Sequence, residues 1–121
     1  MRNALIVTAA AVALALAAGQ ASAHARLILG SPKAGATVAA PKELKLQYSE
    51  TIVPGASSVT VAGPGGAAVA TGKLALDAKD KRVVHLPFAA APGPGPYKVS
   101  WKMKTPDGHT TDGDFAFTVK P

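Results

Sequence analysis

Hydrophobic and polar residues alternate along much of the chain, and the alternation is clearest in three segments. These segments are KELKLQYS, PYKVSWKMK and DFAFTVK, which begin at residues 42, 96 and 114. A period of two residues places every second side chain on the same face of a β-strand, so each segment predicts a strand with one buried face. The residues predicted to face the core are Leu44, Leu46, Tyr48, Tyr97, Val99, Trp101, Met103, Phe115, Phe117 and Val119.

Weaker strand patterns cover residues 26–29, 57–62, 67–70 and 82–86, which brings the expected number of strands to about seven. Clusters of proline and glycine, VPGAS, AGPGGAA and APGPGP, supply turns between them. No helical pattern is evident after residue 23. Short alternating strands separated by Pro and Gly predict an all-β domain with the architecture of an immunoglobulin-like sandwich.

The first 23 residues have a different pattern. A short basic start, MRN, precedes an uncharged apolar run over residues 4–18, and Ala21-Ser22-Ala23 has the small-x-small pattern of a cleavage site. The apolar run is shorter than the roughly 20 residues of a membrane span, so it favours a secretory signal peptide over an uncleaved anchor. Cleavage after Ala23 would leave residues 24–121 as one domain that begins with His24.

Charge and cysteine content limit the possible partners of this exported domain. Without Arg2, 12 basic residues face 7 acidic ones, and the chain has no cysteine. The lysines are scattered singly, which is typical of solubilising charge, and export argues against a nucleic acid partner; weak attraction to an anionic membrane stays open. A small exported domain without disulfides depends on its core, or on a bound ligand, for stability.

Metal-binding chemistry is concentrated at His24 and in the segment TPDGHTTDGDF. A histidine at a free N-terminus offers its α-amine and imidazole Nδ1 as a chelate for one metal ion. Asp107 and His109 are two positions apart and would share one face of an extended backbone. Three nitrogens and one carboxylate oxygen form a set suited to Cu(II). The residues alone leave open that this segment is an ordinary turn that binds no metal, since Pro, Asp and Gly favour turns and most histidines are not ligands.

Three segments carry a resemblance to a known family. They are HARLILGSPKAGATV at the expected mature start, LQYSE, and PYKVSWKMKTPDGHTTDGDFAFTVK. The last is similar to a family pattern of Y-x-V-x-W followed by D-G-H-x-x-x-G-x-x-x-F-x-V, matched by Tyr97, Val99, Trp101, Asp107, Gly108, His109, Gly113, Phe117 and Val119. The chain thus resembles the CopC-type periplasmic copper-binding (copper resistance) proteins.

The resemblance implies a cupredoxin-like or immunoglobulin-like Greek-key β-sandwich. It also implies a Cu(II) site formed by His24, Asp107 and His109. Glu50 resembles a family position near the metal, where it orients the N-terminus or a ligand, or else is a solvated turn carboxylate. The implied role is a periplasmic copper carrier that supports copper resistance or homeostasis, or that hands the ion to a CopD-type membrane importer.

Some features depart from the family pattern. The stretch SVTVAGPGGAAVATG lacks the Met and His of the Cu(I) site that some members carry, so we expect no such site. Met103 is expected to fill the core, and His85 to be a partly buried or surface histidine. Pro106 stands where the family usually has a less rigid residue, which makes the orientation of Asp107 uncertain.

Two other functions stay open. An N-terminal His chelate with a second His also resembles the copper centre of oxidative polysaccharide enzymes, but the domain has one Trp and two Tyr with which to bind a polysaccharide. A metal-free adhesive or assembly module could use the same sandwich. The sequence favours the carrier, and we expect neither an enzyme nor a polysaccharide substrate.

Overall fold

The computed structural model describes residues 24–121, so the predicted signal peptide and its cleavage site lie outside the described residues. It contains eight strands, β1 (Leu27–Ser31), β2 (Thr37–Val38), β3 (Glu43–Tyr48), β4 (Ser58–Ala62), β5 (Ala75–Leu76), β6 (Val83–Pro87), β7 (Gly95–Lys104) and β8 (Thr110–Val119). Two short 3-10 helices, η1 (Pro54–Ala56) and η2 (Pro64–Gly66), lie in Pro-Gly turns.

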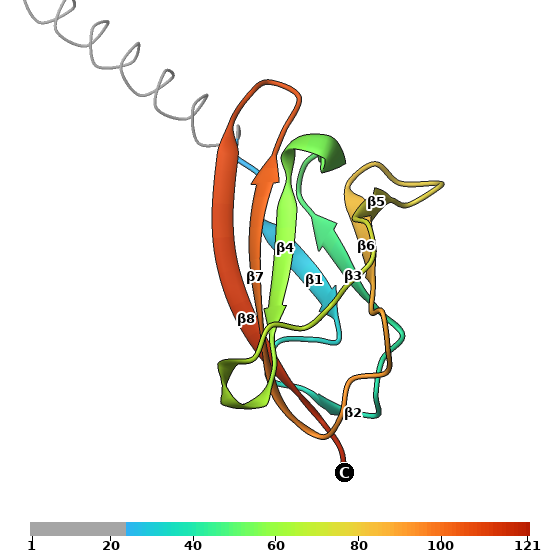
Figure 1. Ribbon diagram of the computed structural model, residues 1–121. Coiled ribbons are helices and arrows are strands. Elements are labelled where there is room, and N and C mark those ends of the chain that lie inside the picture. The colour runs from blue at the N-terminus through green and yellow to red at the C-terminus, as the bar shows by residue number, and fades with distance from the viewer. Residues whose placement is uncertain (1–23) are drawn as a thin grey trace, which may run out of the picture.

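The strands form two four-stranded sheets that face each other (Figure 1). One sheet has the order β1-β3-β6-β5 and the other β2-β8-β7-β4; all neighbours are antiparallel except β2 and β8. The predicted all-β sandwich is therefore confirmed. The ten residues predicted to face the core are all buried, each at most 9 % exposed.

Three local predictions of secondary structure were wrong or incomplete. The segment 67–70 is not a strand but forms only one isolated bridge, Ala62 with Ala68, and a second bridge, Thr71 with Phe88, follows it. Its Gly-rich flanks break the ladder, and the segment instead crosses from the sheet that contains β4 to the sheet that contains β5. Strands β2 and β5 were missed because two residues are too few to show a period.

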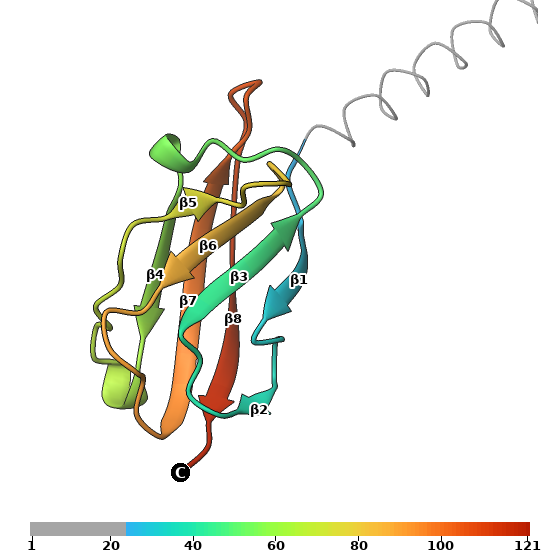
Figure 2. The same cartoon turned by 90° about the vertical axis from the view of Figure 1, so that its right-hand side faces the viewer.

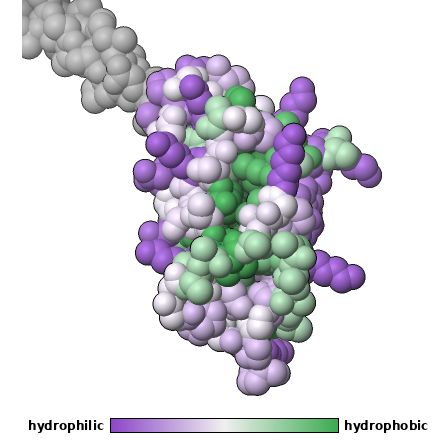
Figure 3. All heavy atoms as spheres, in the orientation of Figure 1, coloured by the Kyte–Doolittle hydropathy of each residue, from purple (hydrophilic) through white to green (hydrophobic). Residues whose placement is uncertain are grey.

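Hydrophobic residues gather across the middle of the face seen in Figure 3, with hydrophilic residues around them. The crossing segment and β5 contribute to the packing there, since Val69, Leu74 and Leu76 are partly buried against the core. Among residues 24–121, no helix is long and apolar enough to cross a membrane.

Strands β7 and β8 form the longest hairpin, with ten paired positions from Gly95–Val119 to Lys104–Thr110. The loop between them and the segment that leads into β1 lie at the same end of the sandwich in two perpendicular views (Figures 1 and 2). This end carries the residues that the sequence analysis selected as metal ligands.

Candidate metal centre

A tight turn connects β7 to β8 and positions Asp107. The amide of Gly108 donates to the carbonyl of Thr105 at 3.0 Å, and the amide of Thr105 donates to the carbonyl of His109 at 3.0 Å. Pro106 occupies the second position of this four-residue turn, where its fixed φ is favoured. Gly108 has a φ of +89°, a conformation that glycine adopts without strain. Pro106 therefore fits the turn that carries Asp107.

Hydrogen bonds fold the Asp107 carboxylate back over the turn. One oxygen accepts from the Thr105 hydroxyl, and the other lies 2.9 Å from His109 Nδ1. The Thr105 hydroxyl, followed by His109, lowers the pKa of Asp107 to about 2. Asp107 is thus ionised throughout the physiological pH range and presents a fixed negative charge beside His109.

The contact with Asp107 also fixes how His109 can bind a metal. When Nδ1 donates its proton to the carboxylate, the lone pair of the imidazole resides on Nε2, the nitrogen on the far side of the ring. Both side chains are well exposed, His109 at 49 % and Asp107 at 52 %. The pair is therefore accessible to an ion from solvent.

The segment before β1 is attached to both sheets. The Thr111 hydroxyl of β8 donates to the carbonyl of Ala25 at 2.8 Å. On the other side, Arg26 and Ser49 exchange hydrogen bonds: the Arg26 amide donates to the Ser49 hydroxyl, and the Ser49 amide donates to the Arg26 carbonyl, each at 2.9 Å. Ala25 is itself buried, at 2 % exposed. His24 is therefore joined directly to a backbone that hydrogen bonds hold in place.

The structure brings His24 and His109 together. Their ring centroids are 5.0 Å apart and their planes meet at 87°. Asp107 joins this pair through His109, but within residues 24–121 no three His, Cys, Asp or Glu side chains form a group that could hold a metal ion. The side chains alone supply an incomplete donor set, because the α-amine of His24 exists only after cleavage before it.

An open hollow of about 400 Å³ lies beside His24, between the edges of the two sheets. Trp101 is part of its lining and is 9 % exposed. A Cβ at Gly113 would come within 2.6 Å of the Trp101 indole, so the backbone of β8 lies directly on the ring. The only tryptophan of the chain therefore lines the same hollow as His24.

Comparison with known proteins identifies the family. The family model described as the CopC domain matches residues 27–120. The chain belongs to the CopC family.

Relatives of this CopC chain include Copper resistance protein C of Xanthomonas campestris pv. juglandis, which is 30 % identical and is matched over 96 % of this chain and 95 % of its own length. Protein YobA of Escherichia coli K12 is 35 % identical over 81 % of this chain and 80 % of its own length.

Two solved structures share the fold of this CopC chain. PcoC, a methionine-rich copper resistance protein from Escherichia coli, has a TM-score of 0.75 and 30 % identity, covering 81 % of this chain and all of that chain. CopC from Methylosinus trichosporium OB3b has a TM-score of 0.74 and 31 % identity, covering 81 % of this chain and 95 % of that chain.

Three other residues were singled out from the sequence, and each has different surroundings. Met103 is completely buried, as predicted, and is the only methionine after residue 1 of this CopC chain. His85, also as predicted, is partly buried, on β6. Glu50 is half-buried in the segment after β3, next to Ser49.

The sequence analysis missed three residues that position the site. Thr105 holds the Asp107 carboxylate, while Ser49 and Thr111 hold the backbone around His24. Thr105 could have been found, because a Thr two residues before an Asp in a Pro-Gly turn is placed to hydrogen-bond it. Thr111 contacts a residue 86 positions away, and no local pattern reports such a contact.

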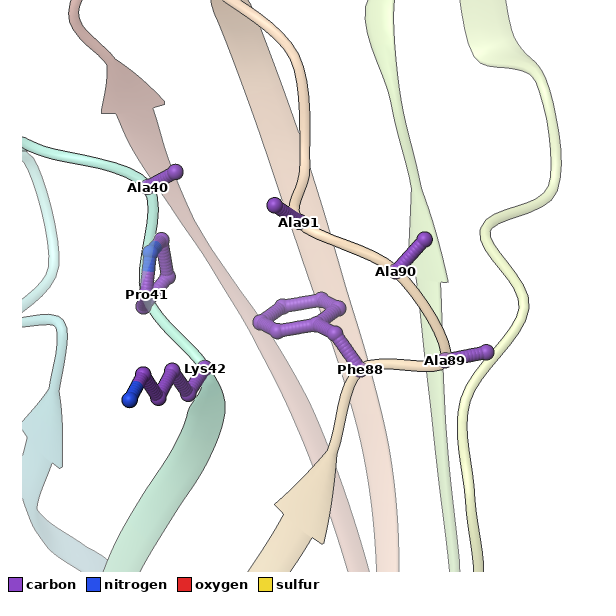
Figure 4. Close-up of a pocket in the computed structure, with 7 residues that line it drawn as sticks. All are labelled: Ala40, Pro41, Lys42, Phe88, Ala89, Ala90 and Ala91. Carbon is purple, nitrogen blue, oxygen red and sulfur yellow. The ribbon is translucent and has the colours of Figure 1, made fainter.

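A second hollow, of about 340 Å³, lies at the opposite end of the sandwich (Figure 4). Its walls are the chain before β3 and the chain after β6, and the Phe88 ring projects from one wall toward Pro41 on the other. Its lining contains no histidine or carboxylate. The second hollow therefore offers none of the side chains expected of a metal site.

Proposed function

We propose that this CopC-family protein is a periplasmic copper-binding protein that binds Cu(II) through His24, Asp107 and His109 after cleavage between Ala23 and His24. The observation that carries the proposal is the 5.0 Å separation of the His24 and His109 rings, two residues 85 positions apart. The copper resistance proteins among the relatives support copper as the metal.

Each residue has a separate part in the proposed site. His24 supplies its α-amine and Nδ1, and His109 supplies the nitrogen that does not face Asp107. Asp107 supplies one carboxylate oxygen to the metal by giving up part of its hydrogen bonding to Thr105 or His109. Glu50 lies beside Ser49, which holds Arg26, and we assign it a supporting role in orienting the N-terminus.

The donor set favours Cu(II) over Cu(I). Imidazole and amine nitrogens with a carboxylate oxygen suit Cu(II), whereas Cu(I) prefers thiolate and thioether ligands. Residues 24–121 include no cysteine and one methionine, whose side chain is buried. Reduction is therefore expected to release the metal, which suits a carrier that hands its ion onward. A CopD-type membrane importer is the proposed receiver.

A carrier fits the surface of the molecule better than an oxidative enzyme does. A histidine pair with an N-terminal amine is also compatible with oxygen chemistry, but an anionic carboxylate in the metal plane leaves less room for oxygen activation. The rim around His24 has no flat aromatic platform among the described residues, since Trp101 is nearly buried. We therefore propose binding and transfer of copper as the function.

The decisive experiment tests the α-amine of His24. Two proteins are compared, one that starts at His24 and one that retains Ala23 before it. The retained residue converts the amine into an amide, so Cu(II) affinity should fall by about 100-fold or more, beyond the usual cost of losing an outer partner. Chelator competition measures the affinity, and electron paramagnetic resonance counts the nitrogen ligands.

The matched control carries one extra alanine after Pro121 instead. It has the same length as the extended protein and should bind Cu(II) as tightly as the protein that starts at His24. Circular dichroism must show that all three proteins fold alike. Equal Cu(II) affinity with and without Ala23 would remove the amine, and with it the proposed chelate.

A further inference from the structure

A second histidine cluster lies on the outer face of the sheet β1-β3-β6-β5. Val84 and Leu86 on either side of His85 are buried, so the His85 side chain projects from the opposite face of β6. His85 Nδ1 lies 2.9 Å from Glu43 Oε1, and His85 Nε2 lies 2.7 Å from Asp77 Oδ1. Glu43 belongs to β3 and Asp77 directly follows β5, so one imidazole bridges three elements.

The two contacts determine the charge of the ring. A neutral imidazole has one N–H donor and one lone pair, whereas an ionised carboxylate oxygen can only accept. Both ring nitrogens of His85 face carboxylate oxygens, so only an imidazolium satisfies both contacts. The side chains of His85 and Asp77 are 25 % and 27 % exposed, which partly shields the contacts from water and strengthens them.

We propose that Glu43, His85 and Asp77 form a proton-binding site, in which an imidazolium at His85 holds β3, β6 and the turn after β5 together. Asp77 links the ring to the turn because its second oxygen, Oδ2, accepts from the amides of Lys79 at 3.0 Å and Asp80 at 3.1 Å. The Asp77 carboxylate that contacts His85 is therefore the same one that accepts hydrogen bonds from the turn amides of residues 79 and 80.

Other charged groups near His85 act more weakly. On β3, Lys45 is its direct cross-strand partner and opposes protonation, while Ala75 opposite on β5 carries no charge. In the turn, Asp80 is engaged by Arg82 at 3.2 Å, and Lys79 and Lys81 are exposed. The two carboxylates in contact thus outweigh Lys45.

The shifts in pKa have the signs that this arrangement requires. The hydrogen bond that His85 donates to Asp77, followed by the one it donates to Glu43, raises the pKa of His85 above its ordinary value near 6.5. The hydrogen bond that Asp77 accepts from His85, followed by the one it accepts from the Lys79 amide, lowers the pKa of Asp77 below its ordinary 3.8.

These signs define the pH range in which the cluster stabilises the fold. The contribution of His85 is fully present below about pH 6.5 and is lost as the pH rises through its higher folded-state pKa. The contribution of Asp77 is present above about pH 3.9 and is lost as the pH falls through its lower folded-state pKa. The cluster is therefore complete in mildly acidic solution.

The test needs no copper and uses the chain that starts at His24. Nuclear magnetic resonance of the ring nitrogens follows the titration of His85, and its pKa should lie above about 6.5. Glu43→Gln and Asp77→Asn should each lower it. Asp114→Asn is the matched control, because it removes an exposed carboxylate, 3.8 Å from Lys98, without touching His85; it should leave the pKa of His85 unchanged.

Denaturant unfolding provides the second measurement. His85→Gln should lower the denaturant concentration at the unfolding midpoint, relative to the wild type. This decrease should be large at about pH 5.5 and at most about half as large at about pH 9.5. If this variant fails to fold, Glu43→Gln replaces it in the same comparison. A His85 that titrates at or below about 6.5 overturns the proposal, as does an equal loss of midpoint at both pH values. Zn(II) that shifts the His85 signals would show a metal site instead.

Discussion

Two histidines of this protein contact carboxylates, and the contacts prepare them for opposite tasks. At the candidate metal centre, Asp107 contacts one nitrogen of His109, Nδ1, and the His109 ring lies 5.0 Å from the ring of His24. On the outer face of the other sheet, carboxylates hold both nitrogens of His85. A histidine with one nitrogen held presents a lone pair in a fixed direction, whereas a histidine with both nitrogens held keeps a proton. The number of carboxylates around the ring therefore distinguishes the proposed ligand, His109, from the proposed clamp, which is His85 held between Glu43 and Asp77.

The largest expected effect is the difference in Cu(II) affinity between His109→Ala and His85→Ala. His109→Ala removes a nitrogen of the proposed metal site, so Cu(II) affinity should fall by about 100-fold or more and the paramagnetic resonance spectrum should lose one nitrogen. His85→Ala should leave both unchanged. Loss of copper binding in His85→Ala, with His109→Ala unaffected, would reverse the two roles.

The second largest effect is expected when the carboxylate charge beside each histidine is removed, because only the change beside His109 should affect Cu(II) affinity. Asp107→Asn should weaken Cu(II) binding by roughly 10- to 100-fold, because it changes a ligand and the orientation of His109. Asp77→Asn should leave affinity unchanged. Chelator competition checks both variants, and equal losses would mean that the effect on copper is general rather than local.

The response of copper binding to pH should not depend on Asp107. Its pKa of about 2 keeps the carboxylate ionised between about pH 5 and 8, so only the amine and imidazoles compete with protons for the metal there. Cu(II) affinity should fall on acidification with the same slope in the wild type and in Asp107→Asn. A shallower slope in the variant would show that the carboxylate takes up a proton on metal release.

The backbone over Trp101 should matter to the metal centre and not to the clamp. Gly113→Ala places a Cβ 2.6 Å from the indole, and such overpacking should lower the free energy of unfolding by about 1–3 kcal/mol. Trp101 fluorescence should shift, while the ring signals of His85 stay where they are. Unchanged stability would mean that β8 can move away from the indole.

The smallest effect is expected below both clusters, at Tyr48. Its hydroxyl is buried and has no hydrogen-bond partner among residues 24–121, and burial raises its pKa far above the ordinary range. Tyr48→Phe removes an unsatisfied polar group and should raise the free energy of unfolding by about 1 kcal/mol. Copper affinity and the pKa of His85 should not change. Denaturant unfolding measures the gain, and a loss of stability would reveal a partner for the hydroxyl.

The sequence predicted the sandwich and its core because alternation reports directly on which side of a strand is buried. It identified His24, Asp107 and His109 as candidates, through one motif and one cleavage pattern. It could not predict the partners of His85, since Glu43 lies 42 positions away and meets it only through the register of β3 against β6. The attachment of Ala25 by Thr111 was equally invisible, because it depends on how two sheets are placed against each other.

The attachment of the N-terminal segment has a consequence for the order of folding. Residues 95–119 pair with their sequence neighbours in one hairpin, so the loop that holds Asp107 and His109 can form early at a small loop-closure cost. The contact between Thr111 and Ala25 closes a loop of 86 residues and is expected to come late. Copper bound between His24 and His109 would then lock the last contact made, and should slow unfolding far more than it speeds folding.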